Sequence, residues 1–397
     1  MKEYKAGIIG TGFIGKQHIE AVSRIPGVSV KAISDINEEA GRAVQQEYAI
    51  PDFYRDYKDM LKDPEIDVIH NCTPTYMHDP VNRECILSGK HIYCEKPLTL
   101  KASQAEELVS LAGEKGVCGA VNFNYRNNVM VHEMKARIEN GKIGTPFLIY
   151  GEYLQDWLLY DTDYDWRMDP MMGGESRAAV DIGSHCLDTM EYILGRKVIS
   201  VYARLINLYP VRKKPAVSKG TFSQSENHSK GESSKENIFT SIAVDSEDAA
   251  FIMLEFEGGI HGLLYLSQVC AGRKNGMSIS VSGTKASMKW DQERMDHLWI
   301  GHRDRGNEDI YASPELLEEK ARVLASLPAG HSVGWADAFR NGIYDFYTHL
   351  GIEKSDYGYA CLTDGWRTME IVEACLKSSR ENRWVEVRDI STLYPHV

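Results

Sequence analysis

The chain has 397 residues, of which 43% are hydrophobic and 26% charged, a globular composition at a length that suits two domains. Its formal net charge of -12 argues against nucleic acid as a partner, because an acidic surface repels phosphate backbones. No apolar run approaches the ~20 residues that a membrane span needs, and the N-terminus lacks a signal-peptide core. We therefore expect a cytoplasmic protein that makes no membrane contact.

Metal and disulfide chemistry are not indicated. The 8 cysteines form no C-x-x-C pair, and no H-E-x-x-H or comparable ligand cluster occurs. The cysteines are expected to be small buried residues of a protein from a reducing compartment, and no metal site is predicted.

The first third of the chain alternates short β-branched runs with helical patterns. Strands are predicted at 5–9, 28–34, 68–71, 91–94 and 117–121. Helices are predicted at 13–25, 38–48, 77–88 and 100–115. This alternation indicates an α/β domain over residues 1–124, with a parallel sheet covered by helices on both faces.

A different pattern follows in residues 125–397. One more helix is predicted at 131–140, and longer alternating strands at 147–153, 198–205, 249–256, 262–268, 277–282 and 286–290. Turns such as Gly258-Gly259 favour a large, mostly antiparallel sheet, so the second domain is expected to be α+β. Residues 212–237 are rich in Ser, Lys, Gly and Glu and predict a mobile loop, either a solvated insertion or a lid over the active site.

A glycine-rich segment, Gly10-Thr11-Gly12-Phe13-Ile14-Gly15, follows the first predicted strand and opens the first helix. A dinucleotide-binding turn requires this context, which makes an ordinary glycine turn the weaker interpretation. Gly10 would permit the tight turn, Gly12 the approach of the backbone to the pyrophosphate, and Gly15 close helix–strand packing. The phosphates would lie at the helix N-terminus.

Asp35 ends the second predicted strand, ~20 residues beyond the glycine segment, where an acidic side chain accepts the ribose hydroxyls. A carboxylate at this place would repel a 2′-phosphate, and neither Ile36 nor Asn37 is basic. The sequence therefore favours NAD over NADP. The alternative role of Asp35 is to cap the next helix, which Asn37 could also do.

Lys96 belongs to Cys94-Glu95-Lys96-Pro97 at the carboxyl end of a predicted strand, the edge at which ligands bind in such sheets. Its charge would favour the alkoxide character that develops on a substrate oxygen as hydride leaves. The alternative is a surface lysine before a turn proline, and this segment alone does not decide between the two.

A histidine with acidic neighbours forms a further candidate. In a helix, Asp181, His185 and Asp188 would share one face at i, i+4 and i+7. His185 could then accept a proton near neutral pH while a carboxylate orients its ring. Helix capping by Asp181 and a core histidine with satisfied hydrogen bonds are the alternative.

Together and in this order, these motifs resemble the Gfo/Idh/MocA oxidoreductases over nearly the whole chain. The matching segments are the glycine turn, Glu95-Lys96-Pro97, Asp181-x-Gly183-x-His185-x-x-Asp188, Asn122-Phe123-Asn124-Tyr125-Arg126, and Thr73-Pro74 with His78. The resemblance implies a Rossmann domain followed by a domain whose open sheet often serves in dimers or tetramers, so a homodimer or homotetramer is expected. It also implies Lys96 as the catalytic lysine, His185 as the acid/base and Asp181 as its substrate-binding neighbour. The residues that would line the nicotinamide side are Thr73, Pro74, His78, Glu95 and Lys96.

A narrower resemblance is to the levoglucosan dehydrogenase-like, sugar-oxidising branch of this family. It is carried by residues 153–157, 165–167, 267–269, 271–275 and 328–331. It implies that the side chains facing the sugar are Tyr125, Gln155, Trp157, Asp181 and His185, with Arg167 beside them and His331 as a candidate to close the pocket. An aromatic side chain with polar neighbours suits the apolar face and the hydroxyls of a pyranose, although Trp157 and Trp166 could also be core residues.

The expected function is NAD-dependent oxidation of a secondary ring hydroxyl of a sugar, anhydrosugar, glycoside or cyclitol. In this hypothesis His185 accepts the proton and Lys96 polarises the hydroxyl. Two other classes stay open: an NAD-dependent glycoside hydrolase of the same fold, and a non-catalytic NAD-binding regulator.

Overall fold

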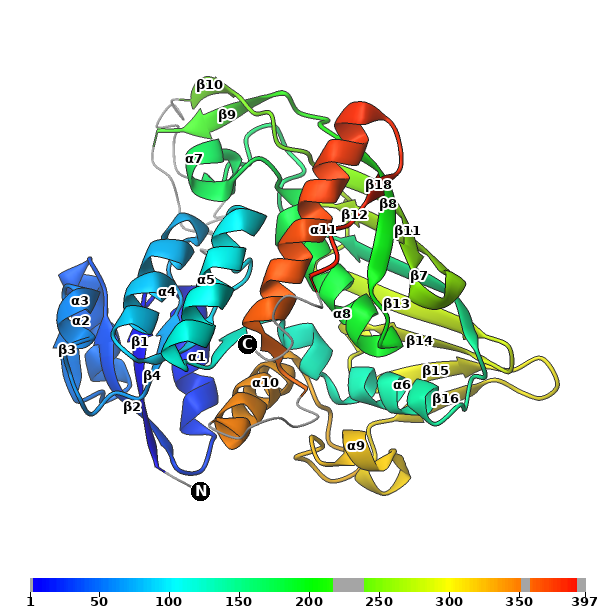
Figure 1. Cartoon of the computed structure of the whole chain (residues 1–397), viewed down its shortest axis with the longest axis horizontal. Helices are drawn as coiled ribbons and strands as arrows, with labels where there is room; N and C mark the ends of the chain where they lie inside the picture. Colours follow the sequence, from blue (N-terminus) through cyan, green and yellow to red (C-terminus); the bar gives the residue numbers. More distant parts are fainter. Residues whose placement is uncertain (1–2, 217–238, 351–357, 391–397) are drawn as a thin grey trace, which may run out of the picture.

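The computed structural model describes residues 3–216, 239–350 and 358–390. Two sheets, one of seven strands and one of nine, dominate it, and helices pack between and around them (Figure 1). None of the described helices is long and apolar enough to cross a membrane.

The seven-stranded sheet has the order β17-β6-β5-β4-β1-β2-β3. Its strands are β1 (Tyr4–Ile9), β2 (Val28–Ser34), β3 (Asp52–Tyr54), β4 (Val68–Asn71), β5 (His91–Cys94), β6 (Gly119–Val121) and β17 (Ala360–Cys361). All pairs are parallel except β17 with β6. The helices that connect them are α1 (Phe13–Ser23), α2 (Glu38–Glu47), α3 (Tyr57–Met60), α4 (His78–Leu87) and α5 (Ala102–Lys115). The predicted Rossmann architecture is confirmed, because buried Ile, Val and Ala side chains of the strands meet helices from both sides.

The C-terminal part of the chain returns to this first sheet. Helix α10 (Trp335–His349) packs on α1, and β17 extends the sheet at β6. Helix α11 (Leu362–Glu381) lies between α5 and the second sheet (Figure 1). The sequence does not predict these elements, and the boundary at residue 124 stays a prediction.

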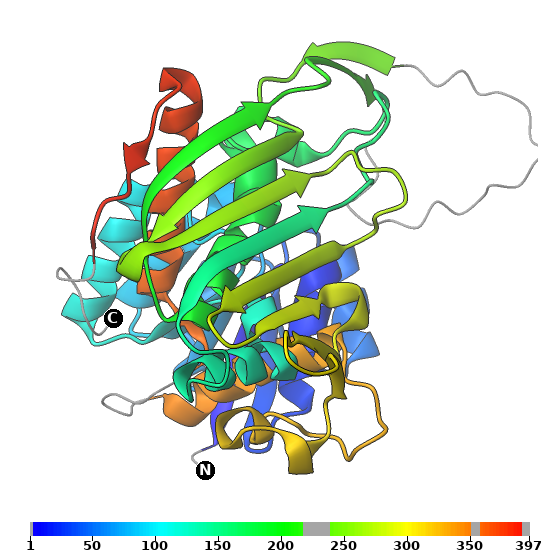
Figure 2. The ribbon, with the colours of Figure 1, turned by 90° about the vertical axis from the view of Figure 1, so that its right-hand side faces the viewer.

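The nine-stranded sheet has the order β16-β15-β14-β13-β7-β12-β11-β8-β18. Its strands are β7 (Pro146–Leu154), β8 (Val198–Ile206), β11 (Ala249–Phe256), β12 (Ile260–Ser267), β13 (Gly276–Gly283), β14 (Ser287–Asp291), β15 (His297–Gly301), β16 (Glu308–Tyr311) and β18 (Val385–Glu386). Only β12 and β7 pair in parallel, so the expected large and mostly antiparallel sheet is confirmed. Figure 2 looks onto the face of this sheet that points away from the first sheet.

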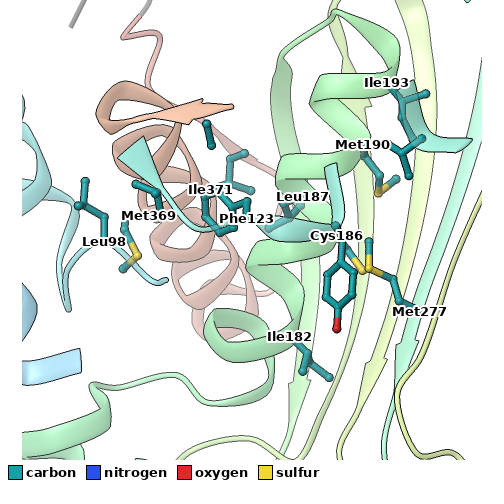
Figure 3. Close-up of a cluster of buried hydrophobic side chains, with 14 of the residues drawn as sticks. Leu98, Phe123, Ile182, Cys186, Leu187, Met190, Ile193, Met277, Met369 and Ile371 are labelled. Carbon is teal, nitrogen blue, oxygen red and sulfur yellow. The ribbon is translucent and has the colours of Figure 1, made fainter. Parts of the chain in front are cut away.

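The inner face of the large sheet is covered by helices α6 (Val129–Glu139) and α8 (Ser184–Leu194). Figure 3 shows α8 between the sheet and α11, with Cys186 and Met190 near Met277 of the sheet and Leu187 near Phe123. These side chains are buried. Apolar packing on both flanks of α8 therefore sets where its N-terminal end, which carries His185, lies relative to the first sheet.

The prediction of a loop at 212–237 is wrong for its first residues, which form a strand. Strand β9 (Val211–Pro215) pairs antiparallel with β10 (Phe239–Ala243). Arg212 is wholly buried, because its guanidinium group pairs with Asp248 and donates to backbone carbonyls of the segment 158–163. Residues 217–238 lie outside the described residues.

Candidate active site

A cavity of about 1490 Å³ opens at the carboxyl ends of the parallel strands and extends to the large sheet. Pockets for one small ligand measure ~300–1,000 Å³, so this one has room for a dinucleotide and a substrate. It is lined by Gly10, Gly12, Phe13, Ile14, Asp35, Thr73, Pro74, His78, Glu95, Lys96, Tyr125, Gln155, Trp157, Arg167, Asp181 and His185. Two predicted site residues, Gly15 and His331, do not line it.

The glycine turn fits a dinucleotide. Gly10 has a φ of +87°, and a Cβ added there would lie 2.8 Å from the Cys72 carbonyl oxygen. A Cβ at Gly15 would lie 2.0 Å from the Gly10 oxygen, so only glycine allows helix α1 this close to the turn. A Cβ at Gly12 would meet nothing within 4 Å, and no side chain among the described residues caps the N-terminus of α1. The N-terminal end of α1 and the open space beside Gly12 suit a pyrophosphate.

Asp35 faces this turn and does not cap a helix. Its Oδ2 accepts hydrogen bonds from Thr11 N and Oγ1, at 2.9 and 2.6 Å. The cap of α2 is Asn37, whose side chain accepts from Ala40 N. The capping alternative is therefore wrong for Asp35, which presents its carboxylate to the cavity.

Two turns of the cavity wall are joined by His78. Its Nδ1 lies 2.6 Å from the Pro97 carbonyl oxygen and its Nε2 lies 2.8 Å from that of Thr73. His78 therefore ties the end of β4 to the end of β5 and stabilises the wall beside Glu95 and Lys96.

Lys96 and Asp181 form an ion pair in the middle of the cavity. Lys96 Nζ donates to Asp181 Oδ1 at 2.7 Å and to the Asp181 backbone oxygen at 2.8 Å. Arg167 Nε lies 3.4 Å from the same Oδ1, and Gln268 Nε2 donates to Oδ2 at 2.9 Å. Burial raises the pKa of Asp181, but Lys96 and Arg167 outweigh it and hold that pKa well below its usual range. Asp181 is therefore a carboxylate between two cations.

His185 is a neutral base beside this pair. Burial, helped by the Lys96 ammonium group, holds the pKa of His185 well below its usual value. Its ring lies 4.8 Å from that of Tyr125, and its Nδ1 has no hydrogen-bond partner within the described residues. A neutral imidazole in a cavity wall can accept a proton.

The prediction that Asp181, His185 and Asp188 share one face of a single helix is wrong. Residues Ala179–Gly183 form a π-helical turn before α8, which breaks the regular spacing of an α-helix. Asp188 turns away and accepts from Arg126 Nε at 2.8 Å. The hydrogen bonds of Asp181 go to Lys96 and Gln268 and not to His185.

A polar wall with aromatic members faces the His185 side of the cavity. Tyr153 and Tyr125 contact each other through their hydroxyls at 3.0 Å, and Tyr153 donates to Asn275 Oδ1 at 2.5 Å. Gln155 Nε2 donates to the same oxygen at 3.1 Å, and Gln155 Oε1 accepts from Trp157 Nε1 at 2.8 Å. The network holds the amide and aromatic groups in one arrangement, which suits a small ligand with several polar groups.

His331 is not brought to this site. It is exposed, and its Nδ1 lies 3.2 Å from the Pro328 carbonyl oxygen within its own turn. The sequence also misses His18, on α1, and His70, on β4, which lie behind the cavity wall. The signal that could have revealed His18 is a titratable side chain three residues after Gly15, on the buried face of the helix.

One cavity connects the glycine turn of the Rossmann sheet to a lysine–carboxylate pair and a neutral histidine. This combination defines the class of NAD-binding oxidoreductases. Residues 4–123 match the family model described as "Oxidoreductase family, NAD-binding Rossmann fold", of the GFO/IDH/MocA group. Residues 131–289 match the GFO/IDH/MocA C-terminal domain. The chain belongs to the Gfo/Idh/MocA oxidoreductases, and NAD is the cofactor of its Rossmann domain.

Similar proteins within this family act on sugars and cyclitols, as their names state. Levoglucosan dehydrogenase from Pseudarthrobacter phenanthrenivorans is 27% identical over 98% of this chain and 100% of its own. Myo-inositol 2-dehydrogenase from Thermotoga maritima is 28% identical over 50% of this chain and 57% of its own. The solved structure of levoglucosan dehydrogenase with NADH and levoglucosan has a TM-score of 0.84 and 26% identity, and covers 98% of this chain and 100% of its own.

Proposed function

We propose that the protein oxidises a secondary ring hydroxyl of a sugar, anhydrosugar, glycoside or cyclitol with NAD as the hydride acceptor. The observation that carries this proposal is the Lys96 ammonium group beside a neutral His185, in a cavity that continues to the glycine turn. Similarity to levoglucosan and inositol dehydrogenases supports the substrate class.

The cofactor would lie along the first sheet. Gly10, Gly12, Phe13 and Ile14, with Gly15 behind them, would hold its pyrophosphate, and Asp35 would accept the ribose hydroxyls. The residues beside the nicotinamide would be Thr73, Pro74, His78, Glu95 and Lys96. The negative charge of Asp35 favours NAD over NADP. Hydride acceptance is the chemistry that bound NAD supplies.

The side chains of this protein then handle the oxygen and its proton. Lys96 donates a hydrogen bond to the substrate oxygen and stabilises its developing negative charge. His185 takes the hydroxyl proton, for which it is ready because it is neutral. Asp181 holds Lys96 in place and accepts from a neighbouring substrate hydroxyl.

The sugar would lie against the polar wall of the second domain. Trp157 and Tyr125 offer aromatic surface, while Gln155 and Arg167 offer hydrogen bonds to hydroxyls. All four line the same cavity as His185. We do not include His331, because it is exposed on its own turn.

The test is NADH formation across a panel of pyranoses, anhydrosugars, glycosides and inositols. We expect turnover with at least one member, and loss of that turnover in Lys96→Ala, which should still bind NAD. Release of free sugar from an aryl glycoside without net NADH would instead indicate the glycoside hydrolase. Absence of turnover with every polyol, in a protein that binds NAD, would contradict the proposal and favour a regulator.

A second copy of the chain is the partner that the large sheet favours. Its outer face exposes apolar side chains on adjacent strands, including Leu148 at 50%, Phe251 at 47% and Leu263 at 43%. A contiguous apolar face of this kind marks an interaction surface. A homodimer or homotetramer would bury it, and no nucleic acid or membrane partner is proposed.

A further inference from the structure

A chain of buried hydrogen bonds leads from the cavity wall into the core of the first domain. Glu95, at the end of β5, is 7% exposed, and its Oε1 lies 3.0 Å from His18 Nε2. His18 Nδ1 lies 2.8 Å from His70 Nδ1, and His70 Nε2 lies 2.9 Å from the hydroxyl of Tyr347. The two histidines are fully buried and Tyr347 is 1% exposed. The members come from α1, β4, β5 and α10.

Glu95 is the anionic end of this chain. Its Oε1 lies 3.0 Å from His18 Nε2 and accepts from Asn122 Nδ2 at 2.6 Å, contacts that favour the ionised carboxyl. The backbone N–H of Lys96 donates to Oε2 at 3.2 Å. A carboxylate only accepts hydrogen bonds, so His18 Nε2 must carry the proton it shares with Glu95.

The protons of the other members follow from the same accounting. The Tyr347 hydroxyl has no acceptor other than His70 among the described residues, and a buried hydroxyl needs one. It therefore donates to His70 Nε2. Burial keeps His70 neutral by holding its pKa well below the usual value, so its single N–H is at Nδ1 and donates to His18. In each hydrogen bond of the chain, the donor is then the group farther from Glu95.

The reversed direction is disfavoured on two grounds. It would require a cationic His18 at a fully buried site, and it would leave the hydroxyl hydrogen of Tyr347 without an acceptor. A buried imidazolium and a buried hydroxyl without an acceptor each carry a desolvation cost. Neither occurs when the hydrogen bonds run from Tyr347 toward Glu95.

A second branch ends on the same carboxylate oxygen. The hydroxyl of Tyr93 donates to Asn122 Oδ1 at 3.2 Å, and Asn122 Nδ2 donates to Glu95 Oε1 at 2.6 Å. The Tyr93 ring also stacks on His70, with ring centroids 5.3 Å apart. Two tyrosine hydroxyls thus begin two series of donors that stabilise one buried anion, while the Lys96 ammonium group is directed to Asp181.

We propose that His18, His70 and Tyr347 are positioning residues that hold Glu95 as an anion beside the nicotinamide and thereby favour NAD over NADH. The proposal rests on the cofactor placement given under the proposed function. The nicotinamide ring is positively charged when oxidised and neutral when reduced, so a fixed negative charge nearby stabilises the oxidised form. Because Tyr347 belongs to α10, the C-terminal part of the chain sets this preference.

The experiment measures the dissociation constants of NAD and NADH by calorimetry on the full chain. We expect the ratio Kd(NAD)/Kd(NADH) to rise ~10-fold in Glu95→Gln, which removes the charge, and ~3-fold in Tyr347→Phe, which removes the first donor. Tyr4→Phe is the matched control, because its ring lies 5.7 Å from that of Tyr347 and its hydroxyl bonds to Leu350. It should leave the ratio unchanged.

A shift in Glu95→Gln with no shift in Tyr347→Phe would overturn the proposal and leave the cofactor placement intact. No shift in Glu95→Gln would overturn both. Nitrogen-15 chemical shifts provide a second readout: His18 and His70 should be neutral, with N–H at Nε2 and Nδ1 respectively, and an imidazolium at either would contradict the chain. If Tyr347→Phe does not fold, Tyr93→Phe removes the donor of the other branch and should raise the same ratio.

Discussion

The ammonium group of Lys96 donates to both a carboxylate oxygen and the backbone oxygen of Asp181, at 2.7 and 2.8 Å. This double contact joins the end of β5, in the first sheet, to the turn before α8, the helix that packs on the large sheet. The same ammonium group lowers the pKa of His185. In the proposed mechanism, the charge of Lys96 therefore acts both on the substrate oxygen and on His185.

Replacing Lys96 by Met should lower kcat by ~10²–10³-fold, because an electrostatic stabiliser of the transition state is lost. The pKa of His185 should rise at the same time, since a neighbouring cation that disfavours the imidazolium is gone. Steady-state kinetics and histidine NMR measure the two effects. Lys115→Met, at an exposed site, is the control, and an unchanged His185 pKa in Lys96→Met would contradict the coupling.

The pH profile of oxidation should have its acid limb below pH 6.5, the ordinary pKa of histidine. His185 must be neutral to accept a proton, and burial together with Lys96 lowers its pKa, so the neutral form persists as the pH falls below that value. The measurement is kcat/KM against pH with NAD saturating. An acid limb at or above pH 6.5 that follows the titration of His185 would show that the pKa of His185 is not lowered.

Asp35→Ser should weaken NAD binding by roughly 10-fold, through loss of hydrogen bonds to a charged acceptor. NADP binding should improve relative to NAD, because the repulsion of a 2′-phosphate disappears. Calorimetric titration of both cofactors gives the comparison. Glu38→Gln, an exposed change in the first turn of α2, should alter neither. Equal losses for both cofactors would argue against a ribose role for Asp35.

Arg212→Met should destabilise the protein by ~3–5 kcal/mol and raise the KM for sugar, because it breaks a buried ion pair. Arg212 pairs with Asp248 and donates to the backbone oxygens of Leu158 and Tyr160, just after Trp157. The neighbouring Lys213→Met removes an exposed pair with Asp161, which is worth only ~0–1 kcal/mol. Thermal melts and sugar kinetics of the two variants separate the roles. Equal effects of the two substitutions would show that Arg212 does not hold the segment after Trp157 in place.

Phe251→Lys should shift an oligomer toward monomer, because it introduces a charge into the apolar outer face of the large sheet. Phe251 is 47% exposed and stacks on Tyr265 with ring centroids 4.9 Å apart. Light scattering after size exclusion reports the mass. Leu316→Lys changes a 76% exposed residue outside the sheet and serves as the control. If the wild-type chain is itself a monomer, the sheet is not an interface between copies.

The sequence predicts best those strands whose ends are marked by local residue types. Strands β2, β4, β5 and β11 have the predicted bounds, because β-branched or aliphatic runs end there at turn-forming residues. Strands β3 and β17 have only 3 and 2 residues, too few for any period. They exist through pairing with β2 and β6, which local sequence cannot show.

Within the site, the residue types could be predicted but their pairings could not. Lys96 and Asp181 are 85 residues apart, and only the packing of α8 brings them together. Helical spacing placed Asp188 beside His185, yet the π-helical turn and the buried Arg126 direct it elsewhere. Local sequence assigns Arg212 to a polar loop because its partner Asp248 lies on another segment. Tertiary contacts decided each of these cases.

Transfer of deuterium from a ring carbon of the substrate to the nicotinamide is the direct test of hydride transfer in this cavity. With the best sugar of the panel labelled at the oxidised carbon, we expect deuterated NADH, equimolar keto sugar and a primary isotope effect on single-turnover rates. His185→Gln should abolish the transfer while NAD still binds. Unlabelled NADH, or product formed without net reduction of NAD, would contradict hydride transfer at this site.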